Sequence, residues 1–199
     1  KVSASTTPTS ATSAAAANLS GCEFFLVNLQ TDDFALFGLT PQFAQDGAAI
    51  DAQWKRLQAQ AHPDKFAAQG VAAQRVAMQW SVRVNEAYQR LRQPITRGAY
   101  LAALLGHPVN AEDNTAMPAA FLMQQMEWRE ALDEAQGDVN GLTQLADDTN
   151  AAKKTYLQLA ELAFDTDKDI PRAVGAIRAL MFIERFLKDV NQQLDALTP

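Results

Sequence analysis

The sequence has little of the chemistry that most metal and cofactor sites use. Its only cysteine, Cys22, excludes an internal disulfide and a cysteine-based zinc cluster, and it favours a reducing compartment. The two histidines, His62 and His107, are too few for a histidine-rich metal site. No stretch approaches the roughly 18 consecutive apolar residues of a membrane-spanning helix. We therefore expect no metal site, no cofactor and no membrane segment.

Charge is divided unequally along the 199 residues. Residues 30–107 carry eight Lys or Arg against six Asp or Glu, whereas residues 108–199 carry eight against sixteen. A mildly basic part followed by an acidic part indicates two units with different partners. We do not expect nucleic acid among those partners, because its phosphates need a clustered basic face.

The start of the chain has low complexity. Fifteen of the first twenty residues are Ala, Ser or Thr, and none is acidic. Such a composition cannot bury enough apolar surface to pack, so we expect residues 1–30 to form a disordered tail. A mitochondrial transit peptide would carry several Arg, and a secretory signal would need a long apolar core. The first twenty residues have neither feature.

The spacing of apolar residues predicts helices and no strands. Acidic residues at Asp32 and Asp33, with Gly38 as a stop, are typical of a short helix. Asp46 is the expected N-cap of a longer helix, on which Lys55 and Arg56 face solvent. The buried stripe of that helix is Ile50, Trp54, Leu57 and Ala61.

The rest of the chain is also predicted to be helical. A polar loop over about 62–70 precedes a helix over 71–92, and Pro94 begins a further short helix. Residues of that short helix expected to face inward are Tyr100, Leu101, Leu104 and Leu105. Three more helices are expected at about 118–136, 139–164 and 169–197. Gly, Pro and Asn mark residues 107–117 as a linker, so we expect an all-α chain with one domain at 31–106 and another at 118–199.

The most informative motif is the triplet His62-Pro63-Asp64. Pro63 removes a donor and fixes φ, so the chain must leave the preceding helix and present His62 and Asp64 at an exposed tip. An exposed carboxylate can pair with an arginine of a partner. Nearby cationic residues would steer an acidic partner to this tip; they are Lys55, Arg56 and Lys65.

Two other interpretations of the triplet are weaker. His62 and Asp64 could only cap backbone groups in a turn, which Asp does commonly. They could also be a catalytic dyad, but no motif places a nucleophile beside them. A His-Pro-Asp triplet between a basic amphipathic helix and a second helix resembles the layout of a J-domain.

The resemblance extends to the HscB co-chaperone family over about residues 32–199. It rests on DFALFGL at 33–39, HPDKF at 62–66, NEAYQRLRQP at 85–94, RGAYL at 97–101 and FLMQQMEWREAL at 121–132. The family implies an L-shaped protein with an N-terminal J-domain and a C-terminal three-helix bundle. It also implies two partners, an HscA-type chaperone of the DnaK class and the IscU-type iron–sulfur scaffold protein. Members in mitochondria can carry a four-cysteine zinc module, which one cysteine excludes here, and this favours a bacterial, cytoplasmic protein.

The helix over 118–136 has two faces in a helical projection. Phe121 and Trp128 share one stripe, whereas Leu122, Met123 and Met126 lie on another beside two carboxylates. Apolar groups rimmed by charge are typical of a partner site, and Met suits an adaptable surface. The family resemblance implies that the scaffold-binding residues are Leu122, Met123, Met126, Glu127, Glu130 and Phe182. Alternatively, these residues could pack on the other helices of the bundle.

The sequence thus predicts a co-chaperone without catalytic residues of its own. It would bind the scaffold, deliver it to the HscA-type chaperone and stimulate that chaperone's ATPase. Met126 and Gln124 stand where the family often has Leu and an acid, and we expect binding to survive both. The alternatives are a J-domain protein with another client and a helical adaptor that stimulates nothing.

Overall fold

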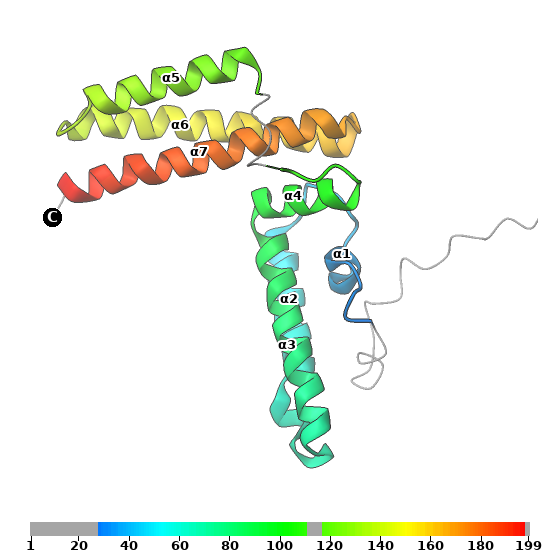
Figure 1. The fold of residues 1–199 in the computed structure, drawn as a ribbon. Coiled ribbons are helices and arrows are strands. Elements are labelled where there is room, and N and C mark those ends of the chain that lie inside the picture. The colour runs from blue at the N-terminus through cyan, green and yellow to red at the C-terminus, as the bar shows by residue number, and fades with distance from the viewer. Residues whose placement is uncertain (1–27, 111–116, 198–199) are drawn as a thin grey trace, which may run out of the picture. The chain divides into compact units, whose positions relative to one another are not determined.

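The computed structural model describes residues 28–110 and 117–197, and every regular element in those ranges is helical (Figure 1). The all-α prediction is confirmed. The described chain forms two compact units by contact. Of the described residues, 28–41 and 46–91 form the N-terminal unit, and 42–45, 92–110 and 117–197 form the C-terminal unit. Most of the expected tail, residues 1–27 with Cys22, lies outside the described residues, as do residues 111–116 of the expected linker.

Local sequence signals set the first helices of the N-terminal unit. Helix α1 (Asp33–Phe37) begins where the Asp32 carboxylate accepts a hydrogen bond from the Ala35 N–H, and it ends at Gly38 with φ of 64°. Only glycine adopts that left-handed conformation without steric cost, so Gly38 acts as the predicted stop. Helix α2 (Gly47–Ala61) begins at Asp46, whose side chain accepts from the Ala48 N–H. The predicted N-cap Asp46 is confirmed, and Asp32 caps α1 in the same way.

Helices α2 and α3 (Val71–Arg92) form an antiparallel pair (Figure 1). The indole ring of Trp54 stacks on Tyr88 with centroids 4.7 Å apart, and its N–H donates to Asn85 Oδ1 at 2.9 Å. One turn further on, Gln58 exchanges hydrogen bonds with Ser81. These contacts hold the two helices together along their length. The segment that connects α2 to α3, residues 62–70, lies at one end of the pair.

A buried carboxylate joins α1 to α3. The Asp33 side chain is fully buried and pairs with Arg83 at 2.5 Å and with Arg90 at 2.7 Å. Two guanidinium groups supply the hydrogen bonds that a buried carboxylate needs. Arg83 also donates to the backbone carbonyls of Leu29 and Thr31. Residues 28–31, at the end of the expected tail, are therefore bonded to α3.

The C-terminal unit is built on a three-helix bundle of α5 (Ala119–Glu134), α6 (Val139–Glu161) and α7 (Ile170–Leu197) (Figure 1). A short π-helical segment, Leu162–Thr166, continues α6. The bundle core is aromatic and aliphatic, and its buried residues are Phe121, Trp128, Leu142, Leu145, Ala146, Ala179, Ile183, Phe186, Leu187 and Val190. The three predicted helices are confirmed, with ends within a few residues of the expected positions.

Helix α4 (Pro94–Leu104) groups with the C-terminal unit and packs on α7. A Cβ at Gly98 would collide with the Ile177 side chain, so glycine permits the close approach of the two helices. The sequence placed this helix in the first domain and the boundary in residues 107–117, whereas the compact units divide after Leu91.

Residues 42–45 also belong to the C-terminal unit, although they lie between α1 and α2 in the sequence. The Asp165 carboxylate in the π-helical segment accepts hydrogen bonds from the backbone N–H groups of Phe43 and Ala44 at 2.8 and 2.7 Å. The buried Arg97 guanidinium donates to the Phe43 carbonyl at 2.8 Å. Burial lowers the pKa of Arg97, an effect that Asp165 opposes.

Two local predictions are corrected. The expected loop over 62–70 contains a 3₁₀ helix, Pro63–Gln69, because Pro63 suits a helical first turn and Phe66 is buried. Leu104 and Leu105, expected to face inward, are 46% and 49% exposed. Helix α4 ends at Leu104, so the periodicity that pointed both side chains inward stops there.

Candidate partner-binding sites

The His62-Pro63-Asp64 triplet lies where α2 ends and the chain turns toward α3. His62 is the C-cap of α2, and its extended backbone with ψ of 123° takes the chain out of the helix. Extended backbone is the conformation that a following proline imposes. The side chains of His62 and Asp64 are 57% and 89% exposed. The structure thus presents both groups at the tip of the α2–α3 hairpin, as predicted.

A hydrogen bond within the turn involves the His62 ring. Its Nδ1 accepts from the Asp64 backbone N–H at 3.3 Å, and the Asp64 carboxylate lies 3.6 Å from the same nitrogen. When the ring is neutral, an accepting Nδ1 leaves the proton on Nε2, from which it can be donated to a partner. His62 therefore caps the turn, as one weaker interpretation expected. The Asp64 carboxylate is 89% exposed and can accept a hydrogen bond from an external cation.

The three cationic residues around the tip differ in exposure. Lys55 and Lys65 are exposed, whereas Arg56 is half-buried and its Nε atom is enclosed. The prediction that Arg56 faces solvent is therefore only partly correct. Phe66 packs inward beside Lys65 and fixes the 3₁₀ helix against the hairpin. The tip is therefore a polar surface, and Phe66 is the buried apolar residue beneath it.

Helix α5 separates its two faces as the projection predicted. Phe121 and Trp128 are buried at 3% and 5% exposure. Leu122, Met123 and Met126 are exposed at 42%, 63% and 63%. Glu127 and Glu130 are also exposed, and we call these five residues the α5 face. The alternative that they pack on the other helices is not what the described structure shows.

Phe182 on α7 is half-buried and belongs to the aromatic cluster beneath α5. Its ring lies 5.8 Å from Phe121 and 6.5 Å from Trp128 between centroids. The guanidinium of Arg129, on α5, lies 5.9 Å from the same ring. Phe182 therefore supports the underside of α5, and only part of its ring is available to a partner.

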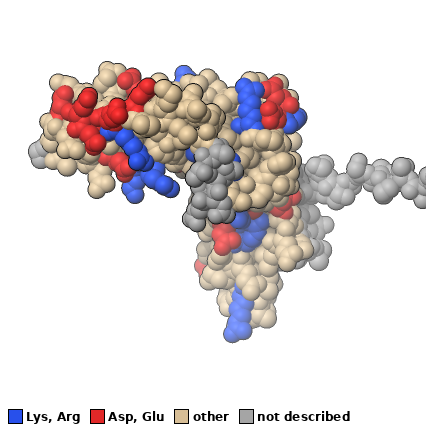
Figure 2. Space-filling view, turned by 45° about the horizontal axis from the view of Figure 1, so that its top comes forward, with Lys and Arg blue, Asp and Glu red and all other residues tan. Residues whose placement is uncertain are grey.

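Acidic side chains gather at one end of the C-terminal unit, with Lys and Arg beside them (Figure 2). At the end of α5 and the start of α6 the exposed acids are Glu130, Asp133, Glu134 and Asp138. An excess of acidic side chains raises the local concentration of cationic partners. The α5 face thus adjoins a surface that favours a basic partner.

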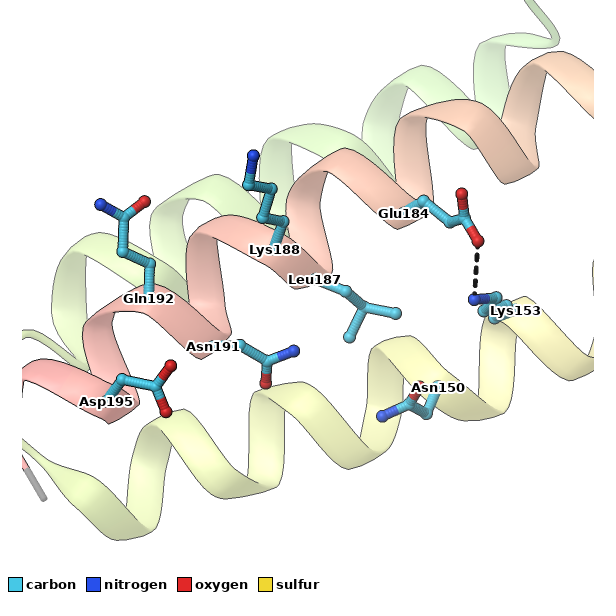
Figure 3. Close-up of a pocket in the computed structure, with 8 residues that line it drawn as sticks. All are labelled: Asn150, Lys153, Glu184, Leu187, Lys188, Asn191, Gln192 and Asp195. Carbon is cyan, nitrogen blue, oxygen red and sulfur yellow. Dashed lines mark hydrogen bonds and ion pairs between the residues drawn. The ribbon is translucent and has the colours of Figure 1, made fainter. Parts of the chain in front are cut away.

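A shallow groove of about 620 Å³ runs between α6 and α7 (Figure 3). It is lined by Asn150, Lys153, Glu184, Leu187, Lys188, Asn191, Gln192 and Asp195. Lys153 and Glu184 form an ion pair of 3.0 Å across it, and Leu187 is its only apolar side chain. The lining combines cationic, anionic and amide side chains, so it does not favour a ligand of one charge. None of the predicted site residues lines this groove.

Sequence reasoning missed the long-range contacts that join the elements within each unit. Asp33 and Arg83 are far apart in sequence, as are Phe43 and Asp165, and only the folded chain brings each pair together.

Within the described ranges, no three His, Cys, Asp or Glu side chains are grouped to hold a metal ion. None of the described helices is both long and apolar enough to cross a membrane.

Comparison with known proteins identifies the family. Residues 117–191 match the family model described as the HSCB C-terminal oligomerisation domain. The chain is 45% identical to a co-chaperone protein HscB homolog of Burkholderia multivorans, covering 86% of this chain and 99% of the relative. It is 48% identical to a homolog of Cupriavidus taiwanensis, over 85% and 97% of the two chains.

Solved structures agree with this assignment. The chaperone HscB from Vibrio cholerae matches with a TM-score of 0.72 and 31% identity, covering 84% of this chain and 99% of that one. Human co-chaperone protein HscB matches with a TM-score of 0.77 and 25% identity, covering 83% of each. From these relatives, together with the helical hairpin, its His-Pro-Asp tip and the three-helix bundle, we conclude that the chain belongs to the HscB family of co-chaperones.

Proposed function

We propose that this protein binds an IscU-type iron–sulfur scaffold protein and delivers it to an HscA-type chaperone of the DnaK class, whose ATPase it stimulates. The observation that carries the proposal is the presence of two exposed surfaces of different chemistry on two compact units. One is the polar tip at His62 and Asp64, and the other is the apolar α5 face. Two such surfaces suit a protein that joins two partners and assists the maturation of iron–sulfur proteins.

The tip would act on the ATPase by differential binding. A ligand shifts a conformational equilibrium only when it binds one conformation more tightly than the other. The exposed Asp64 carboxylate can pair with a cation that the chaperone presents only in its hydrolysis-competent state. His62 holds the turn that aims this carboxylate. Catalysis would then reside in the partner, and this protein would contribute no catalytic group.

The α5 face would hold the scaffold. Leu122, Met123 and Met126 offer apolar area at its centre, and Glu127 and Glu130 provide a charged rim. An apolar centre with a polar rim is the common anatomy of a protein interface. Phe182 would contribute the exposed part of its ring and keep α5 in position. The two homologs compared by sequence are bacterial, and we place this protein in the bacterial cytoplasm with both partners.

The proposal is tested by the steady-state ATPase rate of an HscA-type chaperone with this protein, with and without apo scaffold. We expect stimulation by the protein alone and a larger, synergistic stimulation when the scaffold is added. Stimulation that ignores the scaffold would favour a J-domain protein with another client. No stimulation under either condition would contradict the role of the tip and leave a helical adaptor.

The tip is tested by His62→Gln and by Asp64→Asn. Both side chains are exposed, so the fold should be unaffected, whereas single-turnover ATPase stimulation should be lost. Scaffold binding measured by calorimetry should stay unchanged. His107→Gln is the matched control, because His107 is the other histidine and is also exposed. Stimulation that persisted in the His62 and Asp64 variants would refute the assigned role of the tip.

The α5 face is tested by the double variant Met123→Ala with Met126→Ala. Removing two exposed apolar side chains should weaken scaffold binding by about 1–3 kcal/mol and leave the melting temperature unchanged. Stimulation by the protein alone should also persist. Met78→Ala is the control, since Met78 is similarly exposed but lies on α3. A binding isotherm equal to that of the unaltered protein would move the scaffold site elsewhere.

A further inference from the structure

Three arginines lie around Phe182 at the junction of α5 and α7. The guanidinium of Arg129, on α5, lies 5.9 Å from the Phe182 ring. Arg178 and Arg185 stand four residues before and three residues after Phe182 on α7, spacings at which side chains of a helix are neighbours. At about 100° per residue, both lie within about 60° of Phe182, on the side away from the buried Phe186. We call Arg129, Arg178 and Arg185 the arginine cluster.

The arginine cluster has hydrogen-bonding capacity that the described chain does not use. Arg129 and Arg185 are exposed, and neither forms an ion pair among the described residues. Asp133 and Asp189 follow them by one helical turn each and do not pair with them. Arg178 is half-buried, and its Nε atom is enclosed without a hydrogen-bond partner in the described part of the chain. Because guanidinium donors match a carboxylate, the cluster suits an anionic group from a partner.

The arginine cluster borders the α5 face on the side of α7. In a helical projection Arg129 lies within about 20° of Leu122, two turns away along α5. Met126 and Met123 lie about 40° and 100° from Leu122 in the other direction, and Glu127 lies at about 140°. The charge of this surface therefore changes sign across the apolar side chains, from Arg129 beside α7 to Glu127 on the opposite side.

We propose that the arginine cluster binds an acidic group of the scaffold protein and thereby fixes the orientation of the scaffold on the α5 face, an inference that rests on the proposed function. Apolar contact with Leu122, Met123 and Met126 is not directional and admits more than one orientation. Opposite charges at the two borders favour the orientation that brings carboxylates to the arginines and cations to Glu127. The reversed orientation brings like charges together and is disfavoured.

The test is the double variant Arg129→Gln with Arg185→Gln in the full chain. Both side chains are exposed, and glutamine is well tolerated in a helix, so the fold should be kept. The dissociation constant for apo scaffold, measured by calorimetry at about 50 mM salt, should rise about three- to tenfold. At about 0.5 M salt the rise should fall below about twofold, because salt screens exposed charges.

Lys154→Gln with Lys188→Gln is the matched control. It removes two exposed cations from the same unit, on α6 and α7 and outside the arginine cluster. The net charge therefore changes by the same amount as in the test variant. The dissociation constant should change by less than about twofold at either salt concentration.

A double-mutant cycle detects the contact directly. Each exposed Asp or Glu of the scaffold is changed to its amide and titrated against the unaltered protein and against Arg185→Gln. We expect one or two neighbouring scaffold carboxylates whose removal weakens binding several-fold when Arg185 is present and adds nothing when it is absent. Additive effects for every scaffold carboxylate would show that no acidic group contacts Arg185.

Three further outcomes would overturn the inference and leave the proposed function intact. An unchanged dissociation constant in the Arg129 and Arg185 variant would place the cluster outside the interface. An equal loss in the Lys154 and Lys188 control would assign the effect to net charge. A loss that persists at about 0.5 M salt, with a lower melting temperature, would show that the arginines support the fold. Failure of the unaltered protein to bind the scaffold would instead refute the proposed function, and this inference with it.

Discussion

The two candidate surfaces differ in what holds them. The tip at His62 and Asp64 is a short segment fixed by Pro63, by one side-chain cap and by the buried ring of Phe66. The α5 face lies on a helix whose other side is buried in the bundle core. Side chains of the tip can therefore change without loss of the fold. The α5 face, in contrast, depends on the residues directly beneath it.

Trp128→Ala should have the largest effect, because it removes the support of the α5 face. Trp128 is 5% exposed and stacks on Phe186 with centroids 5.7 Å apart. Truncation of a buried aromatic side chain costs about 3–5 kcal/mol. Hydrogen exchange should become faster in α5, α6 and α7 but not in α2 and α3. Scaffold binding should fall, whereas ATPase stimulation by the protein alone should persist.

Trp54→Ala is the matching variant in the α2–α3 hairpin, which carries the tip. Trp54 joins α2 to α3 through Tyr88 and Asn85. Faster exchange should then be confined to the hairpin, and ATPase stimulation should fall while scaffold binding remains. If both variants accelerated exchange in both units, the two surfaces would not be held independently.

Asp33→Asn should have a smaller effect on the N-terminal unit. Asparagine keeps the shape of the side chain but removes the charge that pairs with Arg83 and Arg90. A hydrogen bond to a charged group contributes about 1.5–3 kcal/mol, so we expect a loss of about 2 kcal/mol in urea unfolding. Asp46→Asn is the control, because Asn caps a helix as well as Asp. Equal stability of the two variants would show that the buried carboxylate contributes no net stability.

Local signals allowed much of the fold to be predicted from the sequence. Asp46 and Pro63 act through backbone groups a few residues away, and the structure places the helix ends where these residues predict them. The two faces of α5 follow from the helical period alone, and the exposed fractions of Met123 and Met126 agree with it. The roles of the tip and of the α5 face stay predictions, since they depend on partners.

Contacts between distant residues were not predicted. Nothing near Asp165 in sequence indicates that its carboxylate binds the backbone of Phe43 and Ala44. Apolar periodicity likewise placed Leu104 and Leu105 inside, although α4 ends at that point and leaves both exposed. Both the contacts of Asp165 and the exposure of Leu104 and Leu105 depend on which other parts of the folded chain lie beside them. That arrangement cannot be read from the local sequence pattern.

The smallest expected effect is that of Tyr156→Phe on stability. Tyr156 packs beneath α5, on the side of the bundle core. Its ring packs edge-on against Phe121 with centroids 5.2 Å apart, and burial raises the pKa of its phenol. The folded state therefore keeps the proton more tightly than the unfolded state does. This contribution to stability is complete below the ordinary tyrosine pKa of about 10, and it is lost as the pH rises through the raised value. Tyr156→Phe should accordingly leave stability at pH 7 nearly unchanged and make unfolding above about pH 10 less steep in a series of urea titrations. An identical alkaline slope in the two proteins would show that other groups cause the alkaline loss, and that the aromatic support of the α5 face does not respond to pH.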